Sequence, residues 1–196
     1  TAGVDIVKAS GVLIVTEAGI AGTISGGVGV KVPGIIFQGI NTSEAIFEVS
    51  INTTSTSVDE SFMVGNSNVD LDLPAGQFFR VEAEARLIVE DQSIKGHFAI
   101  ESTTNQTTGE NLLTIRATGV ELDLTSKDPL TSEVQNIVSL TEGSGALVIS
   151  DAGLAGEING AIAINLKPDV SVIGDFSLRI NNTNAAVNQD FIIAGQ

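Results

Sequence analysis

The sequence predicts an all-β fold, mostly an antiparallel meander in a sandwich-like or an elongated, solenoidal sheet. Three observations lead to this prediction: long stretches alternate apolar and polar residues, glycine is frequent, and no window keeps helical periodicity for long. The 196 residues, 42% of them hydrophobic, are enough to bury a core in one domain or two small ones. The eight phenylalanines all fall in strand-like segments and are expected to fill that core.

The clearest predicted strand runs from Phe79 to Val89. Apolar residues occupy every second position and alternate mostly with charged residues, so one face of the strand is expected to be apolar and the other polar. The alternation resumes over residues 94–100. The gap at residues 91–93 is short enough for a hairpin turn.

The same rhythm predicts four more strands in two hairpins: 13–15 with 21–32, and 113–117 with 120–124. Residues 17–19 and Gly119 are the expected turns. The one helical prediction is a single turn near residues 129–134, capped by Ser126 or Asp128.

A segment near the start of the chain returns near its end. Residues 11–26 match residues 145–160 at an offset of 134 positions, with eight identities. From residue 47 onward the match continues at an offset of 129, so we expect the second segment to lack five residues around the loop at Pro33.

This similarity predicts a tandem repeat. Residues 1–10 would be the tail of a preceding repeat, residues 11–144 a complete repeat, and residues 145–196 the opening of another. A unit that ends in mid-pattern is typical of arrays in which neighbouring units complete the sheet. The alternative is a two-copy domain made by one duplication.

The charge balance restricts the partners. The chain has 24 acidic and nine basic residues, and the formal net charge of −15 would repel nucleic acid and anionic lipid headgroups. It has no cysteine for disulfides or thiolate metal sites, and no run of roughly 18 apolar residues that would predict a spanning helix. We therefore expect copies of the chain or adjacent repeats as partners, no nucleic acid and no transmembrane segment.

Enzymatic activity is not predicted. The single histidine, His97, is expected to point to solvent because alternation places it opposite Phe98. Two carboxylate pairs come nearest to an acid–base arrangement: Glu82 with Glu84, and Asp70 with Asp72. Both pairs are expected to face outward, with Arg80 and Arg86 pairing to the glutamates across strands.

Oxygen ligands at alternate positions mark one candidate calcium site: Asn66, Asn68, Asp70 and Asp72. The segment lacks the glycine and the closing glutamate of an EF-hand, and also the glycine-rich repeat of calcium-binding β-rolls. Asp59 and Glu60, expected in a loop before Phe62, are alternative ligands. No cofactor other than calcium is expected.

An Asn-x-Thr sequence follows a predicted strand in both similar segments, as Asn52-Thr-Thr54 and as Asn181-Asn-Thr183. Asparagine and threonine side chains can bond to the nearby backbone and close a turn. The same sequences match the acceptor pattern for glycosylation. Turn formation is the preferred interpretation.

Three phrases resemble repeats in very large bacterial secreted proteins: Val32-Pro-Gly34, Ile51-Asn-Thr-Thr54, and residues 87–89 followed by residues 94–98. The resemblance implies a bacterial extracellular or cell-surface location and an adhesin, sheath or matrix role. Our leading hypothesis is therefore a structural repeat module that serves assembly, spacing or adhesion through strand-mediated contacts. The alternative is an apolar-ligand or lipid-binding groove in a curled β-sheet, which the mean hydropathy of +0.30 favours.

Overall fold

The computed structural model describes residues 3–32, 35–89, 91–104, 109–127, 132–166 and 170–187. The all-β prediction is confirmed, since the described residues contain strands, turns and bends and no helix. The strands are β1 (Gly3–Thr16), β2 (Gly19–Val32), β3 (Ile35–Gln38), β4 (Ala45–Asn52), β5 (Val58–Val64), β6 (Ser67–Leu73), β7 (Phe78–Val89), β8 (Gln92–Thr104), β9 (Asn111–Lys127), β10 (Val134–Ser150), β11 (Gly153–Leu166) and β12 (Val170–Asn181).

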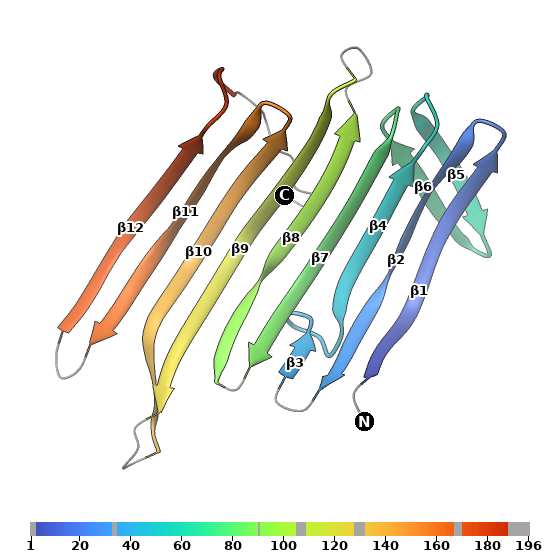
Figure 1. Cartoon of the computed structure of the whole chain (residues 1–196). Helices are drawn as coiled ribbons and strands as arrows, with labels where there is room; N and C mark the ends of the chain where they lie inside the picture. Colours follow the sequence, from blue (N-terminus) through green and yellow to red (C-terminus); the bar gives the residue numbers. More distant parts are fainter. Residues whose placement is uncertain are drawn as a thin grey trace.

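Ten strands form one antiparallel sheet, in which each strand lies beside a strand close to it in the chain (Figure 1). The short strand β3 and the strand β4 share one place in the order, because both pair with β2 and with β7. The elongated form of the predicted meander is therefore the one observed. Within the described part of the chain, β1 and β12 end the sheet.

The register separates apolar from polar side chains. One row of paired residues crosses the whole sheet on one side: Gly11, Ile24, Val49, Val81, Ile100, Ile115, Leu147, Gly156 and Ile180. The adjacent row, on the other side, includes Thr23, Ser50, Arg80, Glu101 and Thr114. We call these two sides the apolar face and the polar face.

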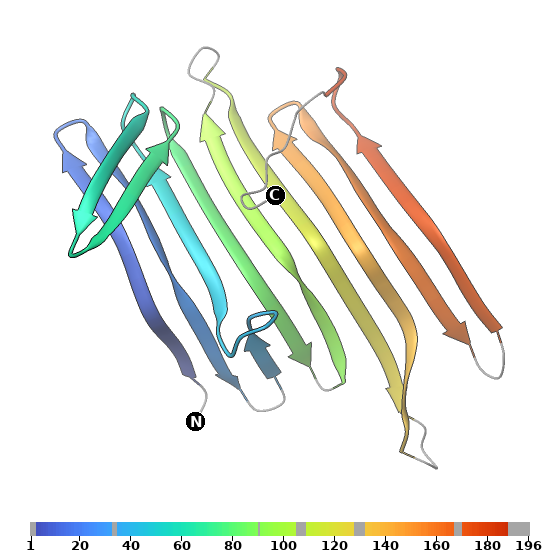
Figure 2. The ribbon, with the colours of Figure 1, turned by 180° about the vertical axis from the view of Figure 1, so that it is seen from behind.

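The hairpin of β5 and β6 lies over the polar face at one corner of the sheet (Figure 2). Leu71 and Leu73 of the hairpin are 1% and 4% exposed, and they form a buried cluster with Ala21 and Phe78 of the sheet. Partly buried residues from β1 and β5, among them Ile14, pack around this cluster. Alternation along β6 thus gives the hairpin one apolar side, which the sheet covers.

The prediction that phenylalanine fills a core is right for Phe78 and wrong for Phe79. Phe78 is 5% exposed beneath the hairpin, whereas Phe79 is 42% exposed on the apolar face. The two side chains point to opposite sides of β7, and only the polar face carries a second layer at this place.

Three other expectations are corrected by the strand boundaries. Gly119 lies inside β9, where its φ of 57° accompanies register shifts against β8 and β10 rather than a hairpin turn. Ser126 lies in β9 and Val134 begins β10, so the predicted helical turn is wrong at those positions, and residues 128–131 lie outside the described residues. Asp59 and Glu60 lie in β5 and not in a loop.

The two similar segments have the same strand pairing. The β1–β2 and β10–β11 hairpins each have a register shift at the equivalent position, beside Lys8 and Glu142, whose φ angles are 52° and 53°. Positive φ is uncommon for residues other than glycine. Its occurrence at both equivalent positions therefore shows that the two hairpins share the same local backbone geometry. The extra residues of the first segment lie at 39–44, between β3 and β4, and not around Pro33 as expected.

Candidate interaction surfaces

A side-chain-capped turn follows β4 in the first similar segment and β12 in the second. Asn52 Oδ1 accepts hydrogen bonds from the backbone N–H and the hydroxyl of Thr54, at 2.9 and 2.8 Å. Asn181 accepts the same two bonds from Thr183, at 2.9 and 2.7 Å. Each asparagine amide also donates to the carbonyl four residues along the chain. The predicted turn role of these sequences is confirmed.

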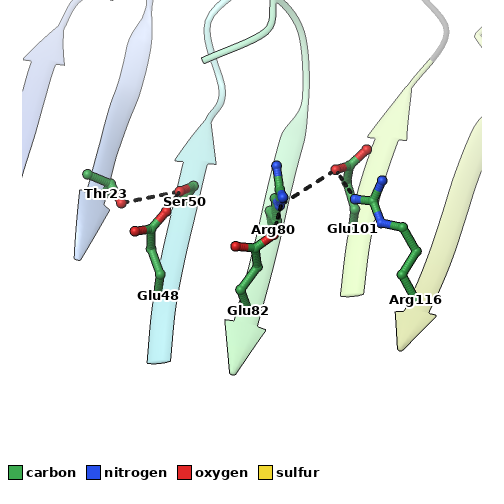
Figure 3. Close-up of polar contacts among 7 residues, drawn as sticks. All are labelled: Thr23, Glu48, Ser50, Arg80, Glu82, Glu101 and Arg116. Atoms are coloured by element: carbon green, nitrogen blue, oxygen red, sulfur yellow. Dashed lines mark hydrogen bonds and ion pairs between the residues drawn. The ribbon is translucent and has the colours of Figure 1, made fainter. Parts of the chain in front are cut away.

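The polar face carries a cluster of ion pairs across β7, β8 and β9 (Figure 3). Arg80 pairs with Glu82 on its own strand, and its Nε lies 3.9 Å from Oε2 of Glu101. Arg116 Nη2 donates a 2.7 Å hydrogen bond to the same oxygen, and the Arg116 side chain is only 7% exposed. Two guanidinium groups thus balance two carboxylates. The sequence patterns did not single out Glu101 or Arg116, because their only sequence signal is a place on the polar side of an alternating strand.

The glutamates Glu82 and Glu84 both lie on the polar face, as predicted. Glu82 pairs along its strand with Arg80 and not across strands as expected. His97 Nδ1 lies 3.7 Å from Oε2 of Glu84, and the histidine side chain is 48% exposed, as its alternation predicts. A hollow of about 340 Å³ beside these groups is lined also by Glu48. Both carboxylates therefore have a basic neighbour on a solvated face.

The expected calcium ligands lie on the β5–β6 hairpin, at its turn for Asn66 and along β6 for Asn68, Asp70 and Asp72. Their side chains are exposed. Asn68 Nδ2 and Ser61 Oγ both donate to Asp70 Oδ1, at 2.7 and 2.5 Å. Among the described residues, no three or more His, Cys, Asp or Glu side chains are grouped to hold a metal ion, and calcium binding here stays a prediction.

Pairs of polar side chains link β2 to β4 in the first similar segment and, at the equivalent position, β11 to β12 in the second. Thr23 and Ser50 share a hydrogen bond of 3.2 Å between β2 and β4. At the matching place between β11 and β12, Arg179 donates to Glu157 from Nε at 2.8 Å and from Nη2 at 3.2 Å. These bonds from Arg179, together with one from Asn159, lower the pKa of the Glu157 carboxyl.

The apolar face is open across the width of the sheet. Eight strands each contribute an exposed large side chain to it: Leu13, Ile24, Phe79, Ile100, Leu124, Ile149, Ile158 and Leu178. In the regular, unbulged parts of the described strands of the large sheet, charged side chains alternate onto the polar face. Large contiguous apolar patches are rare on the surfaces of monomeric soluble proteins.

Glycines opposite large side chains keep the apolar face flat. A Cβ on Gly26 would lie 3.2 Å from Cε1 of Phe47, and a Cβ on Gly160 would lie 3.1 Å from Cε1 of Phe176. Each phenylalanine ring therefore lies across a glycine of the neighbouring strand instead of standing away from the sheet. The arrangement is the same in both similar segments.

A shallow apolar hollow interrupts this flat surface over strands β8 to β11. Its volume is about 220 Å³, and its lining includes Phe98, Ile115, Leu140 and Leu147. Glycines of β10, among them Gly143, leave this space because they have no side chains to fill it.

The outer side of β12 is a regular hydrogen-bonding edge. β12 pairs with β11 without a register shift, and just after it the N–H of Asn182 donates to the carbonyl of Leu154 at 2.9 Å. Backbone groups of successive residues in a strand point in opposite directions. The N–H groups of Ser177 and Arg179 therefore point away from β11, toward the open side.

No protein-family model, curated protein or solved structure matches this chain. Among the described residues, no helix has the length and apolar character needed to cross a membrane. The edges and the two faces of the sheet are therefore the features from which a function is inferred.

Proposed function

We propose that this chain is a structural repeat module of a bacterial extracellular or cell-surface protein, and that it serves assembly, spacing or adhesion by continuing its β-sheet into neighbouring modules or chains. The location follows from the resemblance to repeats of very large secreted proteins. The mode of contact follows from the edges of the sheet.

The observation that carries the proposal is that each edge strand has a paired counterpart inside the same sheet. β1 corresponds to β10, and β10 pairs with β9 on the side that β1 leaves open. β12 corresponds to β4, and β4 pairs with β7 on the side that β12 leaves open. The bulge at Lys8 does not prevent pairing, since β10 has the same bulge and pairs with β9 along most of its length.

An edge with a free row of N–H and C=O groups recruits another strand unless it is protected. Interior strands that correspond to β1 and β12 are paired on both sides, β10 with register shifts against β9 and β4 without one against β7, so a further antiparallel strand fits beside β1 or β12. Adjacent repeats, or copies of the chain, supply such strands.

A second candidate function is the binding of an apolar ligand or lipid, favoured by the hollow over β8 to β11. Its volume of about 220 Å³ is below the range of about 300–1,000 Å³ common for small-molecule sites. The sheet is also open and not curled around the hollow (Figures 1 and 2). These features favour the structural module.

The test is sedimentation equilibrium of the chain and of two variants at one outward-facing residue of β12. Ser177→Pro removes an outward N–H, whereas Ser177→Ala keeps it and is the matched control. We expect the wild-type chain and Ser177→Ala to form the same large species, and Ser177→Pro to form smaller ones. Equal species for all three proteins would refute pairing through β12.

A further inference from the structure

We infer that two copies of this chain pack with their apolar faces together and form a two-layer sandwich. The inference goes beyond the proposed function, which concerns the edges of the sheet. The partner is a second copy, and the contact surface is the apolar face.

The first support is the amount of exposed surface. The chain exposes 12517 Å², whereas a compact monomer of 20.2 kDa exposes about 8,750 Å². The difference is about 3,800 Å² for each copy, which exceeds the roughly 1,000–2,500 Å² that each partner contributes to the interface of an obligate homodimer. One missing layer of protein accounts for a difference of this size.

The second support is the separation of charge. Each copy carries a formal net charge of −15, so contact through surfaces that carry this charge is repulsive. Charged side chains in the regular strands of the large sheet alternate onto the polar face, as Arg80 and Glu101 do. Apolar faces can meet while the charges of both copies stay in water on the outside.

The third support is the shape of the face. Glycines let rings such as that of Phe47 lie flat, which allows two sheets to approach to the roughly 10 Å separation of packed layers. Phe79 and Ile100 project, with 42% and 45% of their surface exposed, and the hollow over β8 to β11 offers space for a projecting side chain. In two copies related by a two-fold axis, the projecting side chains of each copy can face the hollow of the other.

The width of the open face selects a protein sheet over a smaller occupant. Exposed apolar side chains reach from Leu13 on β1 to Leu178 on β12. An acyl chain or one bound strand would cover a narrow stripe of this face, whereas a sheet of the same width covers it all.

The test removes edge pairing first, by using Ser177→Pro as the background for all proteins. Ile100→Lys places a charge on the apolar face, and His97→Lys places the same charge on the polar face of the same strand at a similar exposure. We expect dimers for the background protein and for His97→Lys, and at least 100-fold weaker association for Ile100→Lys. Circular dichroism shows whether each variant is folded, and Ile24→Lys is a second charge on the apolar face should Ile100→Lys unfold.

Native mass spectrometry of the background protein identifies what covers the face. A dimer without additional mass supports the inference. A monomer, with or without phospholipid mass, overturns it, and so does a dimer that persists in folded Ile100→Lys and Ile24→Lys. If the wild-type chain associates and the Ser177→Pro background is monomeric, edge pairing stands and the face contact fails. If the Ser177→Pro background and the wild-type chain are both dimers of the same size, the contact between apolar faces stands and edge pairing fails.

Discussion

Arg179 donates two hydrogen bonds to Glu157 between β12 and β11, the outermost pair of strands. At the equivalent position between β2 and β4, the hydroxyls of Thr23 and Ser50 share a hydrogen bond. The hydroxyl pair lies inside the sheet, where β2 and β4 each have neighbouring strands on both sides. The Arg179–Glu157 pair lies at the edge of the described sheet, where β12 has β11 as its one neighbour. A bidentate, charge-assisted bond is stronger than a hydroxyl pair.

The carboxyl of Glu157 is expected to titrate below the ordinary value for glutamate. Its lowered pKa means that the stabilisation is present above the unfolded-state value of about 4.3 and is lost as the pH falls through the folded-state pKa. Carboxyl-carbon NMR titration measures this value directly. In Arg179→Gln the pKa should return toward normal, and an unchanged pKa would contradict the role of Arg179.

Asn52→Ala is expected to lower the free energy of unfolding by about 3 kcal/mol, because several hydrogen bonds of about 1 kcal/mol each are lost at a buried site. Asn52 is 0% exposed, whereas its counterpart Asn181 is exposed. Asn181→Ala should therefore cost only about 1 kcal/mol, since water can replace the lost bonds. Urea unfolding of both variants checks the difference, and equal losses would show that burial is not the cause.

Leu71→Ala should release the β5–β6 hairpin from the sheet. The side chain is 1% exposed in the cluster beneath the hairpin, and truncation of a buried leucine costs about 2–5 kcal/mol. Hydrogen exchange should accelerate across residues 58–73 and stay slow in β8 to β10. Met63→Ala, at a site 70% exposed on the same hairpin, is the control and should leave exchange unchanged.

Gly22→Ala is expected to destabilise the chain by about 2 kcal/mol. An added Cβ would lie 2.5 Å from the carbonyl oxygen of Val12 and 2.8 Å from Cδ1 of Leu13, so the pairing of β1 and β2 must shift. Gly29→Ala, on the same strand, meets nothing within 4 Å and should be neutral or slightly stabilising. Thermal unfolding compares the two, and similar melting temperatures would contradict the steric explanation.

Alternation along the chain predicted which side chains share a face, but not what covers that face. It placed Phe79 and Val81 on an apolar side and His97 on the other, as the structure shows. It did not predict that a hairpin would cover part of the polar face, because Ala21 and Phe78 lie at the ends of strands where apolar and polar positions are hard to separate.

Local turn chemistry was predictable where it depends on side chains, and less so where it depends on glycine. Asn52 and Asn181 bond to their own turns, so the sequence alone carries the information. Gly119 adopts positive φ in a bulge, and the same residue would suit a hairpin turn equally well. The pairing of β9 with both β8 and β10 determines that Gly119 lies in a bulge and not in a hairpin turn.

Nearly every strand of this meander contacts only its immediate neighbours. The stability of the sheet is therefore built up one seam at a time, where a seam is the contact between two adjacent paired strands. No second layer in the described structure bridges β8 to β12, so the loss of a single seam there separates the sheet into two parts. Folding can begin at any seam and spread in both directions, as in linear arrays of coupled units. Such a sheet can grow wider in evolution without any change to the strands already present.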